Sequence, residues 1–90
     1  MFFRKKDKKY RAIIDGKLYD TSKSEKVLEY GCKSWIPSFD CTYFLYKGEK
    51  EWFVVIRGHI IPKSEYGAKQ ILAEWDVDKY IEYFGEPKLA

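Results

Sequence analysis

The side chains best suited to covalent or metal chemistry are few in this chain. One histidine, His59, and two cysteines, Cys32 and Cys41, could in principle form a Cys-His nucleophilic pair. No pattern marks a nucleophile turn, however, and Cys41 falls on the apolar face of a predicted hairpin, where a thiol is inert. The cysteines are nine residues apart and match no zinc-site spacing with a single histidine. These residues predict two free thiols, no metal site and no catalytic centre.

Phosphate chemistry and acid–base chemistry also lack a sequence signal. No glycine-rich loop follows a predicted strand and opens a helix, as a phosphate-binding loop does. The carboxylates lie on the outer faces of predicted helices, where charged side chains usually serve solvation. We therefore expect a protein that is not an enzyme and that requires no cofactor.

Basic side chains gather at the N-terminus. Residues 1–11 contain six Lys or Arg and one acid, whereas the other 79 residues contain eleven basic and thirteen acidic side chains. Such a segment can bind phosphates with salt-dependent affinity and without reading sequence. Two interpretations stay open: residues 1–9 are a solvated leader, or they bind nucleic acid. The candidate nucleic-acid contacts are Arg4, Lys5, Lys6, Lys8 and Lys9.

Ninety residues predict one domain, here residues 10–90. No apolar run approaches the ~18 residues of a membrane span. The basic N-terminus has no hydrophobic segment behind it, so it does not resemble a secretory signal. We expect a cytoplasmic protein without membrane contact.

The strongest structural signal is a β-hairpin over residues 39–58. Two runs rich in aromatic and β-branched residues flank the polar segment Lys47–Lys50. The predicted register sets Leu45 opposite Trp52 and Phe44 opposite Phe53. One face is then wholly apolar and must be buried. It consists of Cys41, Tyr43, Leu45, Trp52, Val54 and Ile56.

The opposite face of this hairpin is the candidate protein-binding surface. Aromatic anchors with a charged rim are typical of protein–protein hot spots, and a monomer rarely exposes them without a function. The alternative is a second small core, covered by a neighbouring helix or by the loop that contains Trp35. We call this face the aromatic patch; its candidate contacts are Phe44, Tyr46, Glu51, Phe53, Val55 and Arg57.

The remaining elements complete an α+β fold. Asp15-Gly16 predicts a tight turn between two short strands. The segment 22–30 predicts a short helix, because Ser22 and Glu25 form a capping box and Gly31 can end it. Cys32–Ser38 is expected to be a loop. Residues 59–61 predict a short edge strand that Pro62 ends.

Two C-terminal helices follow, the first capped by Ser64 and the second beginning at Asp76 and ending at Gly85. The apolar residues of the first recur with helical spacing up to Trp75, which we expect to be buried against the sheet. The predicted fold is an antiparallel sheet of four or five strands, containing two hairpins, with a short helix and the two C-terminal helices packed on it.

Three motifs together resemble a family of short proteins carried largely by phages and other mobile elements of Gram-positive bacteria. They are IIDGKLYDT, TYFLYKGEKEWFVV and IIPKSEYGAKQILAEWDVDKYIEYFGE, within residues 12–86. Members often carry a longer glycine-rich insertion after the second hairpin; here Arg57-Gly58-His59 replaces it.

The resemblance implies function through binding rather than chemistry. Small proteins from such genetic neighbourhoods commonly block host defences, anti-CRISPR proteins among them. The implied partner is a host defence protein or ribonucleoprotein, and the aromatic patch could also serve a homodimer. The alternative is a small nucleic-acid-binding module that uses the basic N-terminus.

Overall fold

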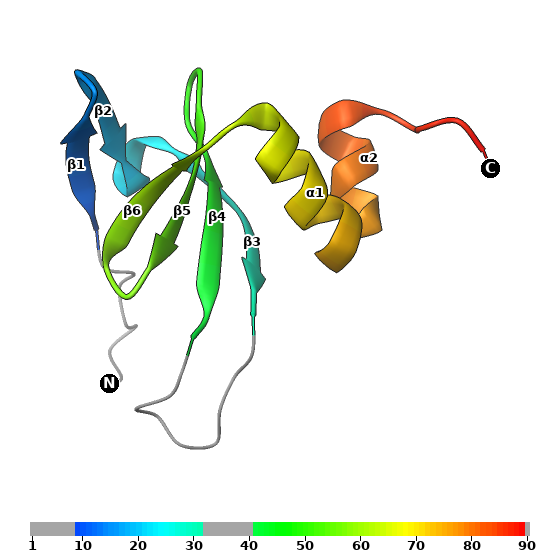
Figure 1. Cartoon of the computed structure of the whole chain (residues 1–90), viewed down its shortest axis with the longest axis horizontal. Coiled ribbons are helices and arrows are strands. Elements are labelled where there is room, and N and C mark those ends of the chain that lie inside the picture. Colours follow the sequence, from blue (N-terminus) through cyan, green and yellow to red (C-terminus); the bar gives the residue numbers. More distant parts are fainter. Residues whose placement is uncertain (1–8, 32–40, 90) are drawn as a thin grey trace, which may run out of the picture.

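The computed structural model describes residues 9–31 and 41–89, which form an antiparallel sheet, a separate hairpin and two helices (Figure 1). The hairpin pairs β1 with β2, and the sheet has the order β3-β4-β5-β6. The predicted α+β fold is therefore confirmed. The elements are β1 (Arg11–Ile14), β2 (Lys17–Asp20), a 3-10 helix (Thr21–Lys23), β3 (Glu25–Tyr30), β4 (Tyr43–Lys47), β5 (Trp52–Ile56), β6 (His59–Lys63), α1 (Glu65–Trp75) and α2 (Val77–Phe84).

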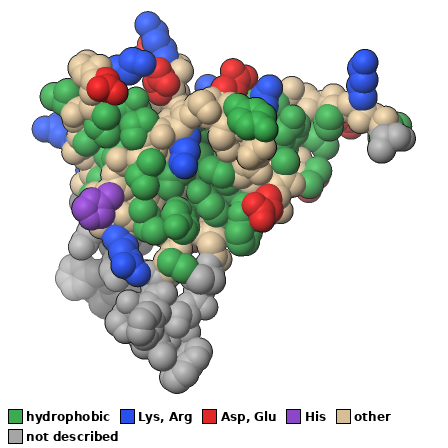
Figure 2. Space-filling view, viewed as in Figure 1, with side chains coloured by type: hydrophobic (Ala, Val, Ile, Leu, Met, Phe, Trp, Pro, Cys, Tyr) green, Lys and Arg blue, Asp and Glu red, His purple; other side chains and the backbone are tan. Residues whose placement is uncertain are grey.

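The four-stranded sheet has a core on each side. On one side, the wholly apolar face of the β4–β5 hairpin packs against Ala68 and Leu72 of α1, as predicted. On the other side, Tyr19 of β2 packs against Tyr46 and Phe53. Figure 1 shows the β1–β2 hairpin and the helices at opposite ends of the view, with the sheet between them. In the same view, Figure 2 shows hydrophobic side chains across the middle of this face and charged side chains of both signs along its upper margin.

The β1–β2 hairpin has the predicted turn and register. Ile13 lies opposite Leu18, and the turn residues Asp15 and Gly16 have φ of 53° and 74°. Positive φ at both positions defines the type I′ turn, whose twist matches that of the flanking strands.

The predicted helix over residues 22–30 is wrong. The carboxylate of Asp20, not Ser22, caps the 3-10 helix by accepting hydrogen bonds from the Ser22 amide and hydroxyl. The chain then continues as β3, with a register shift between Lys26 and Leu28. Val27, Leu28 and Tyr30 pack against the helices from this strand, so tertiary burial overrides the weak helical pattern.

The β4–β5 hairpin has the predicted faces but not the predicted pairs. Leu45 lies opposite Val54, and Lys47 opposite Trp52. The loop closes one residue later than expected, where the Gly48 amide donates to the Glu51 carbonyl at 2.8 Å. This shifts each pairing by two residues, and a two-residue shift keeps every side chain on its own face.

The predicted edge strand is present as β6, but Pro62 does not end it, since the strand continues to Lys63. Ile56 and His59 close a two-residue turn and therefore form a hydrogen-bonded pair. By alternation, Pro62 directs its nitrogen to the open edge of the sheet, where no donor is needed.

Both helices begin and end as predicted. The hydroxyl of Ser64 accepts from the Gly67 amide, the carboxylate of Asp76 accepts from the Lys79 amide, and Gly85 follows α2 with φ of 86°. The expected burial of Trp75 is wrong, because its side chain is 49% exposed. Trp75 ends α1 and contacts the ring of Tyr30 with a centroid distance of 5.6 Å.

Candidate functional site: a cleft beside the β1–β2 hairpin

The β1–β2 hairpin covers most of the aromatic patch. Phe53 and Val55 are 1% and 2% exposed, so the expectation that they face solvent is wrong. The edge of the Tyr19 ring meets Phe53 at a centroid distance of 5.5 Å, and Tyr46 stacks on Phe53 at 5.2 Å. This face is a second core. The element that covers it is the hairpin, not the expected helix, and the Trp35 loop lies outside the described residues.

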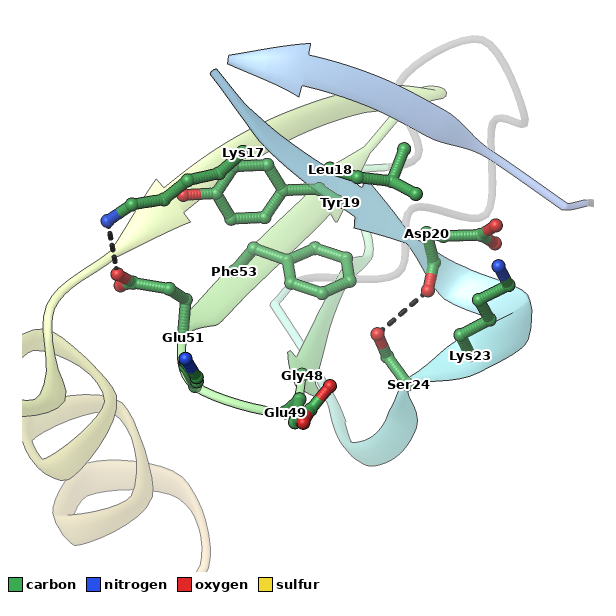
Figure 3. Close-up of a pocket in the computed structure, with 11 residues that line it drawn as sticks. Lys17, Leu18, Tyr19, Asp20, Lys23, Ser24, Gly48, Glu49, Glu51 and Phe53 are labelled. Carbon is green, nitrogen blue, oxygen red and sulfur yellow. Dashed lines mark hydrogen bonds and ion pairs between the residues drawn. The ribbon is translucent and has the colours of Figure 1, made fainter. Parts of the chain in front are cut away.

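At one end of the covered patch, a cleft of about 590 Å³ remains open between β2, the 3-10 helix and the β4–β5 loop (Figure 3). We call it the hairpin cleft. Its aromatic floor is formed by Tyr19 and Phe53, and its rim carries charged side chains of both signs. The rim residues are Lys17, Leu18, Asp20, Lys23, Ser24, Gly48, Glu49, Lys50 and Glu51.

An ion pair closes the cleft where the tip of the hairpin approaches the β4–β5 loop. The Lys17 ammonium donates to Glu51 Oε1 at 2.6 Å. This hydrogen bond and the charge of Glu51 raise the pKa of Lys17 above its usual value. The Lys17 side chain is 58% exposed, so solvent screens the pair and its contribution to stability is small. The pair links the tip of the hairpin to the β4–β5 loop.

Asp20 lies at the opposite end of the cleft. Its carboxylate accepts from the Ser22 hydroxyl at 2.6 Å and from the Ser22 amide at 2.9 Å, and these bonds lower its pKa. The Asp20 carbonyl accepts from the Ser24 hydroxyl at 2.7 Å. Asp20 therefore serves the local structure of the rim, whereas Lys50 and Glu49 are exposed on the loop. A polypeptide with charged and apolar side chains suits such a mixed rim and aromatic floor.

The other end of the patch opens into a smaller groove of about 420 Å³. Phe44 is half-buried there, and Arg57 is exposed in the β5–β6 turn with φ of 50°. Half of the predicted patch residues therefore line this groove (Phe44, Val55 and Arg57), two line the hairpin cleft (Glu51 and Phe53), and Tyr46 is buried.

Sequence reasoning missed Tyr19, Lys17, Lys23 and Lys50 as site residues. Alternation along the predicted first hairpin places Tyr19 and Leu18 on opposite faces, and this pattern is the signal by which Tyr19 could have been identified. Nothing in the local pattern shows which part of the chain that hairpin will contact.

The other candidate residues are not brought together in the described structure. Arg4, Lys5, Lys6 and Lys8 lie outside the described residues, and Lys9 is exposed before β1. His59 is exposed at the start of β6, Cys41 is half-buried before β4, and Cys32 lies outside the described residues. Within residues 9–31 and 41–89, no group of three His, Cys, Asp or Glu side chains is placed to hold a metal ion.

None of the helices in the described part of the chain has the length and the apolar run needed to span a bilayer. Comparisons of the chain with protein-family models, with curated proteins and with solved structures found no match.

Proposed function

We propose that this chain is a non-catalytic, cytoplasmic binding protein of a mobile element that inhibits a host defence component, in the manner of anti-CRISPR proteins. The observation that supports binding is the hairpin cleft, whose Tyr19–Phe53 floor is aromatic and whose rim carries both charge signs. The resemblance of its three motifs to phage and mobile-element proteins supports the choice of partner. The cleft would receive a polypeptide segment of that partner.

The test measures inhibition directly. Cells that carry a defence system are infected with phage in the presence and absence of the full chain, and phage survival is counted. The purified defence component is then titrated with the chain. The informative variant is Lys50→Glu on the rim of the cleft, and its matched control is Lys88→Glu; both lysines are exposed and both substitutions change the charge equally. The proposal expects Lys50→Glu to reduce inhibition and binding by about tenfold, since attraction between Lys50 and an acidic group of the partner becomes repulsion, and expects Lys88→Glu to have no effect.

The nucleic-acid alternative gives a different result. If Arg4, Lys5, Lys6, Lys8 and Lys9 bind nucleic acid, the chain should be retained on heparin or DNA, and retention should fall steeply with salt. Deletion of residues 1–9 would then abolish function, whereas Lys50→Glu would have little effect.

A further inference from the structure

The outer face of the β1–β2 hairpin exposes two aliphatic side chains side by side. Ile13 is 75% exposed, Leu18 is 55% exposed, and the two lie directly opposite each other. They form a non-hydrogen-bonded pair, in which side chains approach most closely. These two adjacent aliphatic side chains offer an apolar contact surface on a two-stranded ribbon.

Within the described residues, the hydrogen-bonding pattern of the hairpin leaves the outer edge of β1 open. Ile14 and Lys17 close the two-residue turn and are therefore a hydrogen-bonded pair; the Thr21 amide donates to the Tyr10 carbonyl at 3.0 Å, in the same alternation. Arg11 and Ile13 fall between these pairs, so their backbone amides and carbonyls point away from β2. Figure 1 shows β1 at the outer margin of the molecule.

The other edges in the described chain are protected in recognised ways. The edge of β6 contains Pro62, the edge strand β3 is irregular between Lys26 and Leu28, and the outward carbonyl of Asp20 in β2 accepts from the Ser24 hydroxyl. β1 has none of these features within its four residues.

We propose that a second copy of this chain pairs antiparallel with the open edge of β1, about a two-fold axis at Ile13. In this register the outward-facing amide and carbonyl of Ile13 pair with those of Ile13 in the second copy. The Arg11 carbonyl faces the Asp15 amide of the second copy, which points outward because the Ile14 carbonyl of the same peptide faces Lys17. The register places Ile13 against Ile13 of the second copy, and each Leu18 extends the apolar contact on its own hairpin. It also sets Arg11 opposite Asp15 of the second copy, twice by symmetry. The open backbone edge also allows a register in which Arg11 pairs with Ile13 of the second copy; the Ile13 contact and the complementary charges select the register about Ile13.

This dimer is distinct from one through the aromatic patch, and it is independent of the proposed inhibition. The hairpin cleft borders β2, whereas the dimer pairs along the outer edge of β1. Leu18 lies on the rim of the cleft and beside the dimer contact, but Arg11, Ile13 and Asp15 do not line the cleft. Loss of dimerisation therefore does not predict loss of inhibition.

The test follows the mass of the full chain by light scattering and sedimentation over a concentration series. The proposal expects a concentration-dependent rise to twice the monomer mass. Ile13→Lys should abolish it without unfolding the chain, because the side chain is mostly exposed. Arg11→Glu and Asp15→Lys should each weaken the dimer by roughly tenfold, because two attractive pairs become repulsive.

Mixing provides the control for misfolding. An Arg11→Glu chain and an Asp15→Lys chain present complementary charges at both ends of the shared edge, so their mixture should dimerise more tightly than either variant alone. Hydrogen exchange locates the contact: the Ile13 and Asp15 amides should become protected as concentration rises, while the Leu18 amide, on the β2 edge, should not. A monomer at all concentrations, a dimer insensitive to Ile13→Lys, or a mixture that fails to recover would each overturn the proposal.

Discussion

Phe53 contacts two aromatic rings on the side of the sheet that the β1–β2 hairpin covers. Tyr19 meets it edge-on, Tyr46 stacks on it, and only 1% of its surface is exposed. Because neighbouring rings are held by the sheet and the hairpin, they can close the space left by a smaller side chain only in part. Phe53→Ala should therefore lower the free energy of unfolding by about 3–5 kcal/mol.

Denaturant unfolding measures this loss, and Val77→Ala is the control. Val77 is 60% exposed at the start of α2, so its truncation should change stability by less than about 0.5 kcal/mol. Equal effects of the two substitutions would show that the hairpin does not bury Phe53 in solution.

Tyr30 makes the stability of the fold depend on pH in the alkaline range. Burial, with a smaller contribution from Tyr43, raises the pKa of Tyr30 from 10.0 to about 12. The folded state thus holds the phenol proton more tightly than the unfolded state. The resulting stabilisation is complete below pH 10 and is lost as pH rises towards 12. Tyr30→Phe, which cannot ionise, should lose less stability over this interval than the parent chain.

Melting temperatures measured from pH 9 to pH 12 test this prediction, each variant being compared with its own value at neutral pH. Tyr66→Phe is the matched control, because the Tyr66 ring is 69% exposed at the surface of α1. If Tyr30→Phe and Tyr66→Phe follow the same alkaline profile, burial of Tyr30 does not govern the transition.

At the scale of the elements, two glycines with positive φ have different surroundings. Gly31 ends β3 with φ of 109°, and an added Cβ would lie 2.7 Å from the Cys41 carbonyl oxygen. Gly16 has φ of 74° in the type I′ turn, with no atom within 4 Å of an added Cβ. Gly16→Ala should cost about 1 kcal/mol, from backbone strain alone. Gly31→Ala should cost roughly 2 kcal/mol more, because β3 and β4 must also separate.

Thermal unfolding of the two variants measures the difference, and hydrogen exchange shows whether the loss for Gly31→Ala is centred on β3 and β4. A smaller loss for Gly31→Ala than for Gly16→Ala would contradict the close approach of Gly31 to Cys41.

Local chemistry explains which elements the sequence could predict. Asp15-Gly16, Ser64, Asp76 and Gly85 each determine a turn or cap through their own backbone and side chains, and all four were predicted correctly. The segment 25–30 was not, because its strand depends on Val27 packing against distant helices. The prediction of the binding site was wrong for the same reason. Alternation identifies the face that contains Phe53, but it does not show that the β1–β2 hairpin covers this face.

At the scale of the whole molecule, the sheet separates two cores that have few shared side chains. One core joins Leu45 and Val54 to the helices, and the other joins Phe53 and Val55 to the β1–β2 hairpin. Adjacent residues of β4 and β5 alternate between them. The hairpin could therefore separate from the sheet while the helices stay in place.

Tyr19→Ala tests this separation. Tyr19 is 6% exposed and is the large aromatic side chain through which β2 contacts Phe53. Without it, the hairpin should detach and the Phe53–Tyr46 face should become accessible. We expect stronger binding of a hydrophobic dye, while the helical circular dichroism and the fluorescence of Trp52, packed against α2 through Tyr83 and Phe84, persist. Dye binding accompanied by loss of the helical signal would instead mean that both cores unfold as one cooperative unit.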